Sequence, residues 1–173
     1  MIPYLACSFL AAFVAVQVLR HDLSLQNDPI SAYLTGPFGW FLDAGFVFLA
    51  AALVWLSLAS DGWAALGFAA GSLGVLWAML TKRIPAMLGQ NIDAPPWEPL
   101  HLLAAAAGFI GTWTGELVFS VQAHLQFGFL LAAVQGALAL LFVHFHSTKT
   151  AILEKLEILL IVTWLIFFGG NLS

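Results

Sequence analysis

Ionisable and hydroxyl side chains gather in two stretches of this sequence, residues 20–43 and residues 82–101, and these are its candidates for chemistry. The candidate residues are Arg20, His21, Asp22, Asp28, Ser31, Tyr33, Asp43, Lys82, Arg83, Glu98 and His101. We predict that they form one polar site, because the elements inferred below bring both stretches to the same end of the molecule.

A metal site is one interpretation, since histidine and carboxylate side chains are zinc ligands. Its ligands would be His21, Asp28, Glu98 and His101. Glu98 and His101 stand three residues apart and would share a helix face. Helical metal sites usually carry more than one Glu-x-x-His pair, and this sequence has a single one. Glu98 is explained equally well as a favourable helix-start carboxylate and His101 as a packed histidine, so we predict no bound metal.

Asp43 and Asp28 each have a structural interpretation beside the functional one. Asp43 lies inside an apolar stretch, where a carboxylate needs a partner because hydrocarbon disfavours its charge. Lys82 or Arg83 is the expected partner in an ion pair, and a proton relay or a substrate contact is the alternative. Asp28 precedes Pro29 and is expected to cap a short helix.

The composition indicates that lipid surrounds most of the chain. Of the 173 residues, 62% are hydrophobic and 8% are charged, whereas soluble domains carry about 25% charged residues. The net charge of -4, without a basic stripe, argues against nucleic acid as a partner. The single cysteine, Cys7, excludes an internal disulfide and is expected to be a small buried residue. No cofactor is identified, and histidines near the ends of apolar stretches do not suit a haem.

Six apolar stretches approach the ~20 residues that a membrane-spanning helix needs. They are residues 2–19, 38–58, 63–80, 99–119, 126–145 and 153–168. Lipid offers no partner for backbone groups, so we expect an all-α bundle of about six transmembrane helices that forms a single domain over residues 1–173. The first stretch lacks the basic residues that open a signal peptide and is expected to be retained.

Six spans would place the first, third and fifth loops on one side of the membrane. All five basic residues belong to that side, namely Arg20, Lys82, Arg83, Lys149 and Lys155. The positive-inside rule then predicts that this side is cytoplasmic and that both termini lie outside. The short second, fourth and fifth loops predict antiparallel helix neighbours.

Within the bundle, small residues four apart predict close helix contacts. Gly67 and Gly71 form one such pair, and Gly111 and Gly115 form another. The intramembrane residues Glu116 and Gln135 are expected to have hydrogen-bond partners.

Two segments are similar to the DUF998 family of bacterial membrane proteins. The first runs from Arg20-His21-Asp22 through Asp28-Pro29-Ile30-Ser31-Ala32-Tyr33 to Gly36-Pro37-Phe38-Gly39-Trp40, and the second is Pro99-Leu100-His101-Leu102-Leu103. The resemblance implies six spans in the bacterial cytoplasmic membrane and a polar site that contains Arg20, Asp22, Ser31, Tyr33 and His101. It implies no reaction.

We expect a non-catalytic accessory or scaffold subunit that contacts lipid, a cofactor or partner helices in a larger membrane complex. Seven Trp and fifteen Phe residues supply aromatic surface for such contacts, and the short loops leave no room for a soluble domain. The expected partners are membrane lipids and other membrane subunits. The alternatives are a metal-assisted hydrolase that acts on a lipid at the interface and a small transporter.

Overall fold

The described part of the chain is helical. The computed structural model describes residues 1–24, 26–91, 96–144 and 150–172, and these form helices and no strand. The long helices are α1 (Ile2–Leu19), α3 (Gly39–Ala59), α4 (Gly62–Met87), α5 (Trp97–Gln122), α6 (Gln126–His144) and α7 (Thr150–Phe168). The short helix α2 (Ile30–Leu34) follows α1, and the 3₁₀ helix η1 (Gly169–Leu172) follows α7. The predicted all-α class is confirmed.

Four helices, α1, α3, α4 and α5, are long and apolar enough to cross a membrane. In α6, residues Gln126–Leu141 form a shorter apolar helix, and α7 carries Glu154, Lys155 and Glu157 near its start. Each of the six predicted stretches is therefore helical, whereas the count of six spans stays a prediction.

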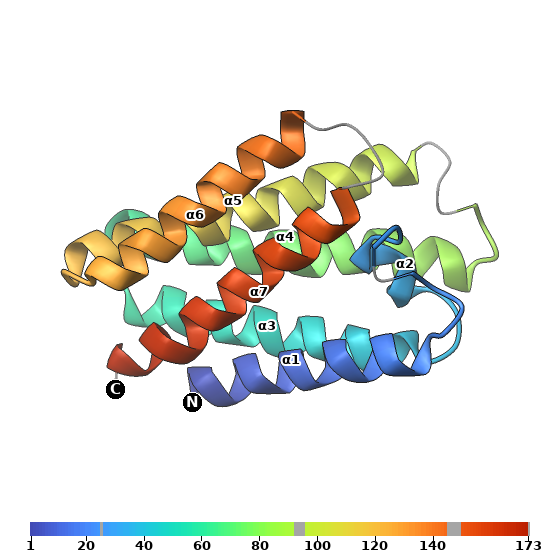
Figure 1. Cartoon of the computed structure of the whole chain (residues 1–173), viewed down its shortest axis with the longest axis horizontal. Helices are drawn as coiled ribbons and strands as arrows, with labels where there is room; N and C mark the ends of the chain where they lie inside the picture. The colour runs from blue at the N-terminus through green and yellow to red at the C-terminus, as the bar shows by residue number, and fades with distance from the viewer. Residues whose placement is uncertain (25, 92–95, 145–149, 173) are drawn as a thin grey trace.

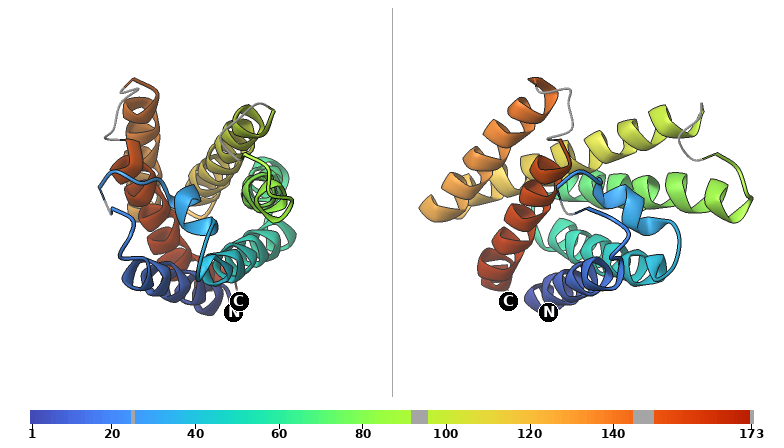
Figure 2. Two further views of the ribbon diagram at one scale, coloured as in Figure 1. Left: turned by 90° about the vertical axis from the view of Figure 1, so that its right-hand side faces the viewer. Right: turned by 45° about the vertical axis from the view of Figure 1, so that its right-hand side comes forward.

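The long helices pack in chain order, and the last returns to the first. Each of α1, α3, α4, α5, α6 and α7 contacts the next in this order, and α7 also contacts α1 (Figure 1). In contrast, α5 and α7 meet only sparingly, and Figure 2 shows them diverging toward the end that holds α2. We call this end, which holds residues 20–24 and 26–38, the loop-one end.

The most extensive helix contact joins α4 and α5 through glycines. A Cβ atom on Gly67 would meet the backbone of Gly115, and one on Gly74 would meet the backbone of Gly108. Small residues allow such an approach between helices that have no hydrophobic reason to associate in lipid. The predicted positions Gly67, Gly71, Gly111 and Gly115 all lie in this contact.

Two local expectations were wrong. Helix α4 was expected to end at residue 80, but it continues through Pro85 to Met87, because Thr81, Lys82 and Pro85 are buried against the bundle. Cys7 is exposed on α1 and is not a buried residue. The short loops at residues 60–61 and 123–125 do join neighbouring helices that pack together, as predicted.

The close contact between α4 and α5 predicts that one methyl group added to a contact glycine lowers the stability of the protein. Gly74→Ala should lower the free energy of unfolding by about 1–3 kcal/mol, because its Cβ would collide with the backbone of Gly108. Chemical unfolding of the purified protein in detergent, followed by circular dichroism, measures the loss. Gly170→Ala is the matched control, since a Cβ there would meet only Pro3 at 3.8 Å. An equal loss in both variants would contradict the contact.

Candidate functional site

Helix α2 lies at the centre of the predicted polar site. It has five residues, and its Ile30, Tyr33 and Leu34 are buried. A helix this short is not stable by itself in water, because nucleation costs more than so few hydrogen bonds return. Contacts with the long helices must therefore hold it.

Helix α7 holds the start of α2. The backbone N–H of Ile30 donates to Oε2 of Glu154 at 3.0 Å, which places a carboxylate at the positive end of the helix dipole. The neighbouring Lys155 donates from Nζ to the carbonyl of Asp28 and lies 5.5 Å from the centre of the Tyr33 ring. Two adjacent side chains of α7 thus fix the segment that leads into α2.

Two arginines hold the end of α2. Arg83 of α4 donates from one terminal nitrogen to the carbonyl of Leu34 at 3.2 Å, and Arg20 after α1 donates to the carbonyl of Thr35. These carbonyls have no partner within the helix, and cations are favourable at this end of the dipole. The two ends of α2 therefore receive charges of opposite sign, each matched to the dipole.

Both arginines also pair with carboxylates. Nε and a terminal nitrogen of Arg20 each lie 2.8 Å from an oxygen of Asp22, a bidentate pair that is buried at the arginine and exposed at the aspartate. The hydrogen bond from Arg20 lowers the pKa of Asp22. Nε of Arg83 lies 3.1 Å from Oδ2 of Asp43, which confirms the predicted type of partner for Asp43. The pair with Arg83 supports the structural interpretation of Asp43, and Asp22 likewise serves as an ion-pair partner.

The capping role predicted for Asp28 is wrong. Its Oδ2 accepts a hydrogen bond from the backbone N–H of Ser24 at 2.6 Å, and α2 has no cap from a side chain next to it in sequence. Glu154, which is 124 residues away in sequence from Ile30, supplies the cap. Sequence proximity therefore selected the wrong carboxylate.

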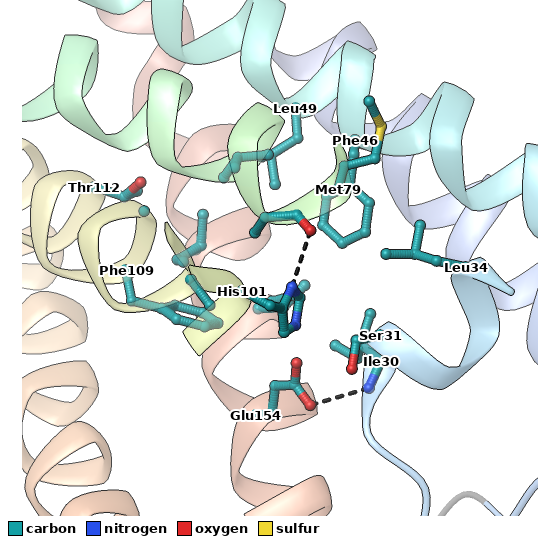
Figure 3. Close-up of a pocket in the computed structure, with 16 residues that line it drawn as sticks. Ile30, Ser31, Leu34, Phe46, Leu49, Met79, His101, Phe109, Thr112 and Glu154 are labelled. Atoms are coloured by element: carbon teal, nitrogen blue, oxygen red, sulfur yellow. Dashed lines mark hydrogen bonds between the residues drawn. The ribbon is translucent and has the colours of Figure 1, made fainter. Parts of the chain in front are cut away.

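His101 is buried near the start of α5, and its ring orientation is determined by a backbone carbonyl. Its Nδ1 lies 2.9 Å from the carbonyl oxygen of Ala78 and 3.3 Å from Oγ1 of Thr81. Because a carbonyl only accepts, Nδ1 is the donor in this contact and carries a hydrogen. Figure 3 shows the ring facing the carboxyl group of Glu154.

A cavity with a volume of about 50 Å³ lies beside His101. Residues of α2, α3, α4, α5 and α7 line it. Its polar lining residues are Ser31, His101, Thr112 and Glu154, and the rest of its wall is apolar (Figure 3). Three of these four polar residues lie where α2 meets α5 and α7, so one end of the cavity is polar and the remainder is hydrocarbon-like.

The proposed metal ligands are not brought together. His21 and Glu98 are exposed, whereas His101 is buried and Asp28 binds the backbone of Ser24. Within residues 1–24, 26–91, 96–144 and 150–172, no three histidine, cysteine, aspartate or glutamate residues form a group that could hold a metal ion. Lys149, one of the basic residues in the topology argument, lies outside the described residues.

Sequence reasoning missed several polar residues of the bundle interior. It gave no role to Glu154 or Thr112. It also expected partners for Glu116 and Gln135, but both carboxyl oxygens of Glu116 and both amide atoms of Gln135 are buried without a hydrogen-bond partner among the described residues. The spacing of Thr112 and Glu116 in the sequence could have predicted that they lie on the same face of α5, since residues four apart share a helix face.

The cap from α7 is testable by replacing its carboxylate. Glu154→Ala should lower the free energy of unfolding by about 0.5–2 kcal/mol and speed hydrogen exchange at the amide of Ile30, which loses its acceptor. Glu154→Gln retains an acceptor oxygen and should have a smaller effect. Hydrogen exchange measured by mass spectrometry compares them, with Glu98→Ala as the control. Unchanged exchange at Ile30 in Glu154→Ala would contradict the cap.

The Arg20–Asp22 pair predicts an acid-sensitive contribution to stability. The pKa of Asp22 is lower in the folded protein than in the unfolded chain, so the pair stabilises fully above the ordinary aspartate pKa of ~3.9 and loses its effect as the pH falls through the lowered value. The melting-temperature difference between wild type and Asp22→Asn should therefore shrink below about pH 4. A difference that stays constant in acid would show that the pair contributes nothing through its charge.

Comparison with known proteins identifies no relative of this chain: no family model matches it, and neither does any curated protein or solved structure. The resemblance to the DUF998 family therefore stays a prediction.

Proposed function

We propose that this protein is a non-catalytic membrane protein with six transmembrane helices, which binds an acyl chain of a membrane lipid in the cavity beside His101. The observation that carries the proposal is the distribution of polarity in that cavity. Its wall is apolar along α4, α5 and α7, and polar side chains gather toward α2.

The apolar wall favours hydrocarbon over water as the occupant. Apolar cavities stay dry, because water finds no hydrogen-bond partners in them. A volume of about 50 Å³ exceeds the ~10–15 Å³ that one water needs, so a slender chain end can enter, whereas a ring cofactor cannot without movement. Filling this volume would recover about 1 kcal/mol of lost packing.

The polar end suits the ester region of a lipid. The Ser31 hydroxyl can donate to an ester carbonyl, and the cationic side chains of Arg20 and Lys155 lie at the same end of the bundle. We propose that an acyl chain enters the cavity from the bilayer between α5 and α7, because these two helices make little contact.

The wider role that we propose is that of an accessory subunit in the bacterial cytoplasmic membrane, with the loop-one end on the cytoplasmic side. The short connections between its helices and its many exposed large apolar side chains support contacts with lipid and with partner helices. A metal-assisted hydrolase is less well supported, because His21 and Glu98 are exposed and separate from His101.

Photolabelling tests the lipid site. Proteoliposomes that contain a phospholipid with a photoreactive group near the end of one acyl chain should label the parts of α5 and α7 that line the cavity. Ala105→Phe fills the cavity and should reduce this labelling several-fold, whereas Ala107→Phe, at an exposed position of the same helix, should not. Mass spectrometry of the peptides measures both. Equal labelling of wild type and Ala105→Phe would overturn the proposal.

A further inference from the structure

A second group of polar side chains lies deeper in the bundle than the loop-one end. It is contributed by three helices: Glu116 by α5, Gln135 by α6 and Glu157 by α7. Their exposed fractions are 0%, 1% and 6%, so all three are shielded from the surroundings. The lipid site proposed above does not use them.

Within the part of the chain that the structure describes, neither carboxyl oxygen of Glu116 and neither amide atom of Gln135 makes a hydrogen bond of ordinary geometry, although the Gln135 side chain lies beside the carboxyl group. Glu157 is the other acidic group near enough to act on Glu116 through its charge. Two carboxylates and an amide thus share one apolar region without a neutralising cation among them.

Aromatic rings of three helices pack together near Gly115, which precedes Glu116 in the sequence. Phe68 of α4 contacts Phe119 of α5 and Trp164 of α7, and its ring lies next to Gly115. Residues 126–141 of α6 contain no ionisable side chain.

The charged groups of the other packed helices lie toward the loop-one end. Those of α4 are Lys82 and Arg83, those of α5 besides Glu116 are Glu98 and His101, and those of α7 besides Glu157 are Glu154 and Lys155. Arg83 pairs with Asp43, and Lys155 contacts Asp28 and Tyr33. A negative charge on a fully buried carboxyl group in an apolar interior is strongly unfavourable.

We propose that Glu116, Gln135 and Glu157 form a proton-binding site, in which Glu116 holds a proton at neutral pH. The protonated carboxyl group has a hydroxyl that can donate to the amide oxygen of Gln135, while its carbonyl oxygen can accept from the amide NH₂. A carboxyl group buried in apolar surroundings favours its neutral form, because burial disfavours the charged form. Thr112, one turn earlier on α5, lines the cavity.

An apolar carbodiimide, dicyclohexylcarbodiimide, is a suitable probe of a protonated carboxyl group in an apolar region. The carboxyl proton moves to one nitrogen of the carbodiimide, and the carboxyl oxygen bonds to its central carbon. The acyl group then migrates from oxygen to nitrogen and leaves a stable N-acylurea without a leaving group. The purified full-length protein in detergent, at about pH 8, well above the ordinary glutamate pKa of ~4.3, should carry one label on the peptide that contains Glu116.

Glu116→Gln should abolish this label, and Glu98→Gln, a change at an exposed carboxylate on the same helix, should leave it unchanged. Infrared difference spectra of wild type and Glu116→Gln at the same pH give an independent readout, because wild type should show the carbonyl band of a protonated acid that the variant lacks. This readout also stands if the reagent cannot reach the site.

Absence of the acid band in wild type would overturn the proposal. The proposal would also be overturned if sodium chloride, but not potassium chloride, prevented the carbodiimide from labelling Glu116 at constant pH. That result would indicate a cation site in place of a proton site. Neither result bears on the lipid site, because its test compares the photolabelling of α5 and α7 in wild type and in Ala105→Phe.

Discussion

The whole loop-one end depends on the backbone groups of one short helix. Helix α2 lies among apolar side chains, where a backbone N–H or C=O without a partner is costly. Glu154 satisfies its start, and Arg83 and Arg20 satisfy its end. Because these side chains come from α7, α4 and the end of α1, three helices that are distant in sequence must converge on five residues. The polar site is therefore first a structural device, and any ligand must be accommodated beside it.

The close contact of α4 and α5 has an effect on the opposite side of α5. Glycines let the two backbones approach, and α5 then lies against α4 and makes little contact with α7. The cavity lies among α2, α3, α4, α5 and α7, so both the tightly packed pair and the more loosely packed α7 contribute to its wall.

Much of the helical architecture could be predicted from the length and apolar character of the stretches, since these properties are local. The ion pair of Asp43 was also predictable, because few cations were available to it at that end. The cap of α2 could not be predicted, because its donor and acceptor are 124 residues apart in sequence. Pro85 within α4 was missed because burial of the surrounding residues overrides the usual tendency of proline to end a helix. The unpaired Glu116 was missed because the usual rule that buried polar groups find partners fails there.

The two hydrogen bonds from α7 to the region of α2 join residues 124 and 127 positions apart in a chain of 173 residues. During synthesis, the ribosome releases α1 and α2 long before α7 exists. Until the last helix is inserted, the N–H of Ile30 has no Glu154 to bind, so α2 can take its final position only as one of the latest events of assembly. A chain that stops before residue 154 would therefore lack the acceptor that binds the first N–H of α2.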